Sequence, residues 1–460
     1  MTKTMKTKAK TYEMDMCSGP ILKKMLIFAI PLICSSVLQL LFNAADVIVV
    51  GRFAGDNSLA AVGSTTALVN LFVNFFMGLS ISANVLVARY YGAKHERDLS
   101  ETVHTAMAIS FVSGVFLTII GLIFSPILLQ MMQTPKDILP LATVYLRVYF
   151  VGMPAMMVYN FGAAILRAIG DTKRPLYFLV IAGVINVVFN LIFVIVFRWD
   201  VFGVGLATTI SQVVSALFVL RCLMKENSGI RVELRKIRIY KEKLIKILQL
   251  GLPAGLQSTL FSLSNVLIQS SVNGFGEVVV AGNSAASNIE GFVYVAMNAL
   301  YQANISFTSQ NIGAGKTRRI HRILLTAQGC VIVVGLVLGI GSYLGGPVLL
   351  RFYTESSAVV EAGMVRLSFV GLTYALCGIM DVMVGSLRGM GYAVFPMIVS
   401  LIGSCGLRIL WLQTIFRIEE YHRIETVYVI YPITWVITLL AHMITYLVVT
   451  RKFRCKDKES

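Results

Sequence analysis

The sequence predicts an all-α polytopic membrane protein, with twelve transmembrane helices arranged as two six-helix bundles in a parallel pseudo-two-fold repeat. Three observations lead to this fold class: an apolar composition, apolar runs of membrane-spanning length, and a repeat between the two halves. The 460 residues are 57% hydrophobic and 14% charged, and the mean hydropathy is +0.77. A soluble protein of this length needs far more polar surface to cover its core.

Apolar runs recur from one end of the chain to the other. A run of about 20 residues crosses a ~30 Å hydrocarbon layer as a helix. Helices are favoured because lipid offers the backbone no hydrogen-bond partners, and because the strands of a barrel would alternate in polarity. We identify twelve runs, at residues 26–50, 59–88, 99–127, 138–166, 176–198, 203–224, 246–272, 280–309, 320–345, 360–387, 395–416 and 428–450.

The formal net charge of +17 is distributed unevenly along the chain. Most of the 40 Lys and Arg residues lie before the first run, in every second connector, or after the last run. This asymmetry predicts that both termini and those connectors face the cytoplasm. We expect a multi-pass protein of the cell membrane, here a bacterial inner membrane. Nucleic acid is excluded as a partner because no segment is long enough for a basic soluble domain.

Three segments of the first half recur in the second half at an offset of 222 residues for the first pair and 221 for the other two. Each half has six runs, an even number, so both halves enter the membrane in the same direction, and such duplications favour alternating access. The matched segments are AIPLICS with GLPAGLQ, RYYGAK with QNIGAG, and ILRAIGDTKRP with SLRGMGYAVFP. The predicted organisation is a cytoplasmic tail (1–25), an N-terminal lobe (26–224), a basic linker (225–245), a C-terminal lobe (246–450) and a second tail (451–460).

The longest polar connector, residues 221–247, reads RCLMKENSGIRVELRKIRIYKEKLIKI. Its basic and partly amphipathic pattern is typical of a helix that lies along the inner face of a membrane. We therefore predict an interfacial helix between the two lobes.

Charged residues inside the runs are the main indication of function, because such residues are costly in lipid and usually face a bundle interior or a water-filled cavity. A carboxylate at such a place can take up a proton or bind a cation. The embedded charges are Asp46, Arg147, Glu290, Arg366, Asp381 and Arg408. Arg147 and Arg366 occupy corresponding positions, and their side chains are long enough to reach the membrane interface.

Two pairs of amides accompany these charges. Asn186 and Asn190 lie four residues apart and therefore on one helix face, as do Asn265 and Gln269. Amides at this spacing bond across helices or line polar pathways. We predict that Asn186 and Asn190 face Asp46 inside the N-terminal lobe.

Depth along the helices predicts a partner for Arg408. At ~1.5 Å per residue, Glu290 lies roughly 15 Å below the outer boundary of a ~30 Å core, and Arg408 about 11 Å below it. Asp381 lies only ~9 Å above the inner boundary by the same count. Arginine stays charged and needs an anion or water at this depth. We therefore expect Glu290, rather than Asp381, to balance Arg408.

Taken together, the repeated halves, the first-run pattern P-x(14)-D-x(5)-R, the segment SQNIGAGK and the paired LRAIGDTKRP and LRGMG resemble multidrug and toxic compound extrusion (MATE) transporters. The match covers nearly the whole chain. The resemblance implies a V-shaped pair of bundles that exports organic cations in exchange for H⁺ or Na⁺, with no other cofactor. It implies that Asp46 belongs to a coupling-ion site, to which we add Asn186 and Asn190. Many relatives have Asp where this chain has Asn190, which favours protons over a two-carboxylate sodium site.

The substrate is expected to be a small amphipathic organic molecule that binds in a cavity between the lobes of a lipid-embedded, monomeric protein. No clustered His or acidic residues indicate an enzyme, and neither histidine nor cysteine spacing indicates a bound metal. The nearest alternative is a lipid-linked oligosaccharide flippase of the same broad superfamily, for which basic side chains should outnumber acidic ones on the cavity wall. The cavity candidates are Glu290, Asp381, Asn265, Gln269 and Arg408.

Overall fold

A computed structural model describes residues 12–459, with side chains up to residue 451, and in this part of the chain every regular element is helical. The first eleven residues of the expected tail 1–25, and Ser460 of the tail 451–460, lie outside the described residues. The first half contains α1 (Ile21–Phe53), α2 (Asp56–Gly92), α3 (Glu96–Met131), α4 (Leu139–Val151), α5 (Met153–Ala168), α6 (Lys173–Leu191) with the π-helical η1 (Ile192–Val196), and α7 (Asp200–Met224).

The second half repeats this order with more interruptions. It contains α8 (Lys241–Asn273), α9 (Glu277–Gly313), α10 (Thr317–Leu344), α11 (Gly346–Arg351), α12 (Ser357–Arg366), π-helical η3 (Leu367–Gly371), α13 (Tyr374–Gly389), α14 (Val394–Ser400), π-helical η4 (Leu401–Gly406), α15 (Leu407–Gln413) and α16 (Ile424–Glu459). Short 3₁₀ turns are η2 (Leu234–Lys236), η5 (Ile415–Arg417) and η6 (Glu419–Tyr421).

The twelve expected spans correspond to these helices. Nine helical segments in the described chain are long and apolar enough to cross a membrane unbroken. Two more are bent: α4 and α5 meet at 46°, and the α12–η3 segment meets α13 at 41°. The twelfth is α9, a helix of 37 residues whose Asn, Ser and Glu side chains make it less apolar than the others. The fold is therefore a twelve-helix, two-repeat membrane fold.

The repeat found in the sequence holds in the backbone. Helices α2 and α9 are both 37 residues long, and α5 and α13 are both 16, with their ends 221 residues apart. The turns before α2 and α9 use Gly55 and Gly276, each at φ +90°. The turns after α5 and α13 use Gly170 and Gly391, at φ +92° and +96°, a conformation that L side chains rarely adopt.

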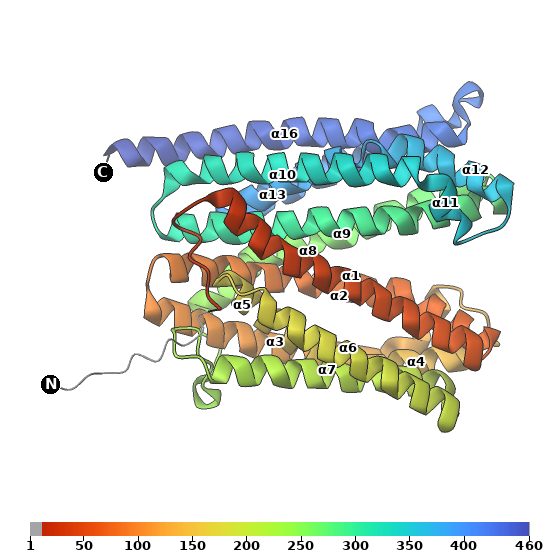
Figure 1. The fold of residues 1–460 in the computed structure, drawn as a ribbon, viewed down its shortest axis with the longest axis horizontal. Helices are drawn as coiled ribbons and strands as arrows, with labels where there is room; N and C mark the ends of the chain where they lie inside the picture. The colour runs from red at the N-terminus through yellow and green to blue at the C-terminus, as the bar shows by residue number, and fades with distance from the viewer. Residues whose placement is uncertain (1–11, 460) are drawn as a thin grey trace.

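The two lobes lie side by side and share their first helices (Figure 1). Helix α1 starts beside α9 and α10 and ends beside α6, while α8 starts against α2 and α3 and ends in the second lobe. Met25 and Phe28 of α1 are accordingly buried in the second lobe, whereas Val50 is buried in the first. We call the end of the bundle where α1 begins and α16 ends the basic end; both lie on the left in Figure 1.

The lobes pack tightly at the basic end. A Cβ on Gly92 would collide with the backbone of Gln310, and a Cβ on the repeat-related Gly313 would collide with the backbone of Arg89. The two contacts mirror each other, since Gln310 and Arg89 are also 221 residues apart. The Gln310 amide also donates to the carbonyl of Ala168 in the first lobe, at 2.7 Å. Only glycine permits this close approach of the helices.

A peptide of residues 12–20, which we call the strap, crosses this contact. The backbone N–H of Met14 bonds the carbonyl of Ile169 in the first lobe, at 3.1 Å. The Met16 side chain is fully buried in the second lobe, and its carbonyl accepts a hydrogen bond from Asn311 at 3.1 Å. The Ser18 hydroxyl, which donates to Asp15, is the main cause of the lowered pKa of that carboxyl. The strap therefore ties both lobes together.

The linker is not the interfacial helix predicted from its sequence, and that prediction is wrong. Only the three-residue η2 interrupts an irregular path from Lys225 to Tyr240. Ile230 and Val232 are buried in the core of the first lobe. His104 accepts the backbone N–H of Glu233 at 3.1 Å. Burial of these two apolar side chains and side-chain capping of the backbone outweigh the amphipathic pattern.

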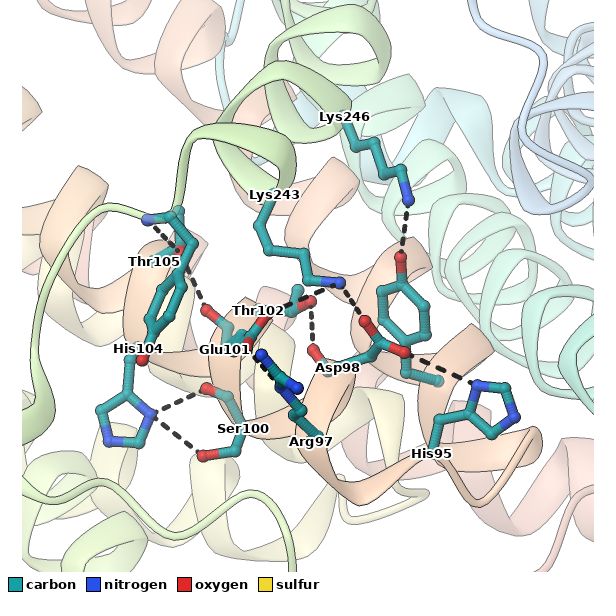
Figure 2. A network of polar contacts seen from close by, with 12 residues as sticks. His95, Arg97, Asp98, Ser100, Glu101, Thr102, His104, Thr105, Lys243 and Lys246 are labelled. Carbon is teal, nitrogen blue, oxygen red and sulfur yellow. Dashed lines mark hydrogen bonds and ion pairs between the residues drawn. The ribbon is translucent and has the colours of Figure 1, made fainter.

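The start of α8 completes the attachment of the linker to α3 (Figure 2). Lys243 is 2% exposed and forms an ion pair with Asp98, with Glu101 3.9 Å away. The Thr105 hydroxyl accepts the backbone N–H of Tyr240 at 3.2 Å. This polar network anchors the second lobe's first helix to the first lobe.

Candidate functional site

A carboxylate and two amides meet in the N-terminal lobe. The amide of Asn190, on α6, donates to the carboxylate of Asp46, on α1. The same amide group lies 3.4 Å from the carbonyl oxygen of Asn186, one turn earlier, and Asn186 donates to Thr208 of α7 at 3.3 Å. The structure thus brings together the three residues proposed from sequence. Both asparagines are buried, and Asp46 is half-buried.

The cluster is short of one hydrogen-bond donor. The carbonyl oxygen of Asn190 is buried and has no partner. Within the described residues no group of three or more His, Cys, Asp or Glu side chains could hold a metal ion. The described cluster thus offers one carboxylate, two neutral amide groups and the hydroxyl of Thr208. Such a set can accept a proton or coordinate a monovalent cation, both of which add positive charge to a lone carboxylate.

A polar cavity lies in the C-terminal lobe, where it faces the first lobe. Its volume is about 580 Å³, and its wall is formed mainly by α8, α9, α13 and α16. The first lobe contributes Asn74 and Ile81 of α2. All five cavity candidates from sequence lie on its wall: Glu290, Asp381, Asn265, Gln269 and Arg408. The Asp46 cluster is not part of the wall, so carboxylates occupy two separate places.

The predicted pairing of Arg408 with Glu290 is wrong. Glu290 is paired with Arg366, whose Nη2 lies 2.7 Å from its carboxylate and whose Nε lies 3.1 Å from it. Arg366 also donates from Nη1 to Asn283 at 2.7 Å, and Asn283 donates to Gln269 at 2.8 Å. Arg366 is buried in the cavity wall rather than extended to the interface, whereas Arg147 is exposed. The two arginines are 219 residues apart and not 221, so the expected correspondence is wrong: Tyr145 is the repeat-related residue of Arg366.

Arg408 has neutral partners instead. Its Nη1 lies 3.4 Å from the amide oxygen of Asn265, and its Nε lies 3.3 Å from the Thr434 hydroxyl. The guanidinium carbon lies 4.4 Å from the centre of the Tyr431 ring, within the range of a cation–π contact. Depth alone placed Glu290 and Arg408 at similar heights, but they lie on different helices, α9 and α15, and have different partners.

Asp381 lies at another part of the wall. No described Lys, Arg or His side chain forms an ion pair with its carboxylate within 4.0 Å; Arg388 acts on the carboxylate at longer range, and Tyr294 is its neutral polar neighbour. Arg388 donates to the Tyr301 hydroxyl and, at 2.8 Å, to Gln257. Sequence analysis did not propose Arg388 for the cavity, although the repeated Leu-Arg motif contains it. The repeated motif marks Arg388 as a notable residue, but only the packing of the helices shows that it lies on the cavity wall.

This fold and cavity define a class: a membrane protein built from two repeated bundles, with a polar cavity in one bundle that faces the other. The sequence model named MatE matches residues 31–192 and 253–412, so that both repeats are matched. The chain therefore belongs to the MatE family, whose members are transporters and not enzymes.

Relatives agree with this assignment. The chain is 29% identical over 429 residues to the probable multidrug resistance protein YoeA of Bacillus subtilis, covering 91% of this chain and 92% of that protein. It is 27% identical over 394 residues to the probable multidrug resistance protein YpnP of the same organism, covering 86% and 88%. A solved structure described as the outward-facing conformation of a multidrug resistance MATE family transporter superposes with a TM-score of 0.87 at 24% identity, covering 97% and 98%. That likeness supports the fold alone.

Proposed function

We propose that the protein is a secondary active multidrug exporter, which moves amphipathic organic molecules, cations among them, in exchange for H⁺ or Na⁺ by alternating access. The observation that carries this proposal is the separation of two polar sites. The cavity lies in one lobe, and the Asp46 cluster lies in the other. The ion and the substrate can then favour different arrangements of the two lobes, so that binding of one weakens binding of the other although they share no binding residues.

The Asp46 cluster binds the coupling ion in this proposal. With the carboxylate ionised, the site attracts a cation; with the carboxylate protonated or sodium bound, the local charge is neutral. Helices α1, α6 and α7 all contribute side chains, so the charge state of Asp46 acts on the packing of three helices. Because α1 starts in the second lobe, a change in its angle reaches the cavity side.

The same proposal assigns orientation and assembly. The basic end faces the cytoplasm, as the distribution of Lys and Arg predicts. The tight contact of the lobes at that end corresponds to a state closed to the cytoplasm. The protein acts as a monomer in a bacterial cell membrane, without nucleic acid, because each chain contains both lobes, the cavity and the Asp46 cluster.

A second candidate is a flippase for lipid-linked oligosaccharides, favoured by one observation. Three arginines, Arg366, Arg388 and Arg408, face two carboxylates, Glu290 and Asp381, on the cavity wall. A basic excess fits a pyrophosphate better than it fits an organic cation. The excess is a single charge, and the apolar and aromatic wall fits small amphipathic molecules, so the exporter remains the first candidate.

Purified protein in liposomes tests the proposal. The liposomes are loaded with a fluorescent amphipathic dye, and proton and sodium gradients are imposed separately. Dye movement that accelerates under one gradient and stops when that gradient is collapsed supports the exporter. Movement at the same rate with and without either gradient would reject coupled export. Movement of a pyrophosphate-linked lipid, and of no dye, would favour the flippase.

A further inference from the structure

One positive charge in the cavity has no protein carboxylate to balance it. Glu290 is fully engaged by Arg366. Asp381 forms no ion pair within 4.0 Å among the described side chains, and the arginine that acts on it at longer range is Arg388, not Arg408. These two assignments use both acidic side chains of the cavity wall, and Arg408 remains. Throughout the part of the chain whose side chains are described, no carboxylate lies within 4.0 Å of its guanidinium nitrogens.

The surroundings of Arg408 hold the guanidinium in place without neutralising it. The side chain is 2% exposed. Asn265 and Thr434 accept hydrogen bonds from Nη1 and Nε, and Tyr431 covers one face. The remaining nitrogen, Nη2, makes no hydrogen bond to any described residue. Protein groups thus occupy Nη1, Nε and one face of the guanidinium, and the edge at Nη2 is left for a ligand.

An arginine in this position has a strong preference for an anion. Its guanidinium stays charged at any physiological pH and matches the oxygens of carboxylates and phosphates. A charge removed from water and left unpaired is costly, and a ligand that brings the opposite charge removes this cost. Tyr374 and Trp435 line the same cavity and offer aromatic surface to the body of a ligand.

We propose that the substrates carry an anionic group, a carboxylate or a phosphate, that pairs with Arg408, joined to an aromatic or apolar body. This inference rests on the proposed transport function, and narrows its substrates from amphipathic organic molecules in general to amphipathic anions and zwitterions. The cationic part of a zwitterion can lie against the aromatic rings of Tyr374 or Trp435 on the same wall. Dyes with a cation alone leave Arg408 unpaired and bind more weakly.

The test uses pairs of probes that differ by one anionic group. Rhodamine 110 carries a free carboxylate, and rhodamine 123 is its methyl ester and carries only the cation. A fluorescent lysophosphatidic acid and the monoacylglycerol with the same chain form the lipid pair. Binding to the purified full-length protein is measured by fluorescence anisotropy at fixed salt, for the wild type and for Arg408→Gln and Arg408→Lys. Thr434→Val is the matched control, because it removes one contact of Arg408 but keeps the charge.

The wild type should bind the member of a pair that carries the anionic group about tenfold or more tightly than the member that lacks it, the value of one charge-assisted hydrogen bond. Arg408→Gln should abolish this preference, while Arg408→Lys and Thr434→Val should keep most of it. A preference found only in the rhodamine pair would show that the anionic group belongs to free small molecules. A preference confined to lysophosphatidic acid assigns it to lipid phosphate. Equal affinity for both members of both pairs in the wild type would overturn the inference, whether or not Arg408→Gln folds.

The two proposals fail differently. If gradient-driven transport of rhodamine 123 occurs and Arg408→Gln leaves every binding ratio unchanged, the transport function stands and the anionic substrate class is rejected. If binding depends on Arg408 as described but no gradient moves any probe, the anion site stands and the exporter is rejected.

Discussion

Gly92 of the first lobe lies directly against the backbone of Gln310 of the second lobe, and there is no room between them for a Cβ atom. The repeat-related pair, Gly313 and Arg89, makes the same contact from the opposite side. This close packing between the lobes is therefore symmetric and lies at the basic end. In an alternating-access cycle this contact must separate and form again, which makes it a sensitive place to perturb the balance of states.

Gly92→Ala should destabilise the structure described here by about 1–3 kcal/mol, the usual cost of an added methyl group without space. Gly63→Ala is the matched control on the same helix, because a Cβ there meets nothing within 4 Å. Thermal unfolding in detergent checks the prediction. Equal melting temperatures for the two variants would contradict a close contact at Gly92.

Met16→Asp should open the basic end. The substitution places a charge in an apolar site between Met25, Phe28 and Phe307, so the strap should leave its site. Spin labels at Arg97 and Arg318, exposed and 221 residues apart at the starts of α3 and α10, report the separation of the lobes. The distance distribution should gain a longer component. Tyr12→Asp, at an exposed position of the same strap, should leave it unchanged, and an unchanged distribution in Met16→Asp would refute this role.

The stability of the protein should depend on keeping both charges of the buried Glu290–Arg366 pair or on removing both. Glu290→Gln alone should lower the free energy of unfolding by about 3–5 kcal/mol, because Arg366 is then left buried and uncompensated. The double variant Glu290→Leu with Arg366→Met should recover most of that loss. Unfolding in mixed SDS–detergent micelles measures both. The exposed Arg97 pairs with Glu101 at 3.0 Å, and Arg97→Gln should make no measurable difference. A double variant as unstable as the single one would mean that packing, and not charge, dominates.

Much of the fold could be predicted from the sequence because the same signals occur in both halves of the chain. Membrane-spanning runs and a constant offset define twelve helices and two halves, and the backbone shows the same offset at Gly170 and Gly391. The cluster around Asp46 was also predictable. Asn186 and Asn190 lie on one face of an unbroken helix, and a buried carboxylate needs polar partners.

The partner of Glu290 was not predictable from depth. Depth gives a height along the bundle, but it does not give the direction in which a side chain points around the axis. Helices in this lobe are also interrupted, since α12 passes into the π-helical η3 before the 41° bend to α13. Arg366 therefore points into the cavity wall, although its length would have allowed it to reach the interface.

The linker shows that a local sequence pattern can also predict the wrong secondary structure. Its amphipathic pattern favours a helix, but Ile230 and Val232 fill a site in the first lobe and the chain between them and Tyr240 stays extended or turned. Local preference is weak compared with tertiary contacts of this kind. His104 and Thr105, which bond the linker backbone, belong to a distant segment.

The central claim is that Asp46, outside the cavity, couples substrate movement to an ion gradient. The most direct test is the steady-state ratio of dye across liposomes under an imposed gradient, for the wild type, Asp46→Asn, and the exposed control Asp56→Asn. The wild type and Asp56→Asn should accumulate dye against its own gradient. Asp46→Asn should fold but should only equilibrate the dye, to a ratio near unity, because an amide keeps the shape but cannot carry the charge. Accumulation by Asp46→Asn at the wild-type ratio would contradict the claim.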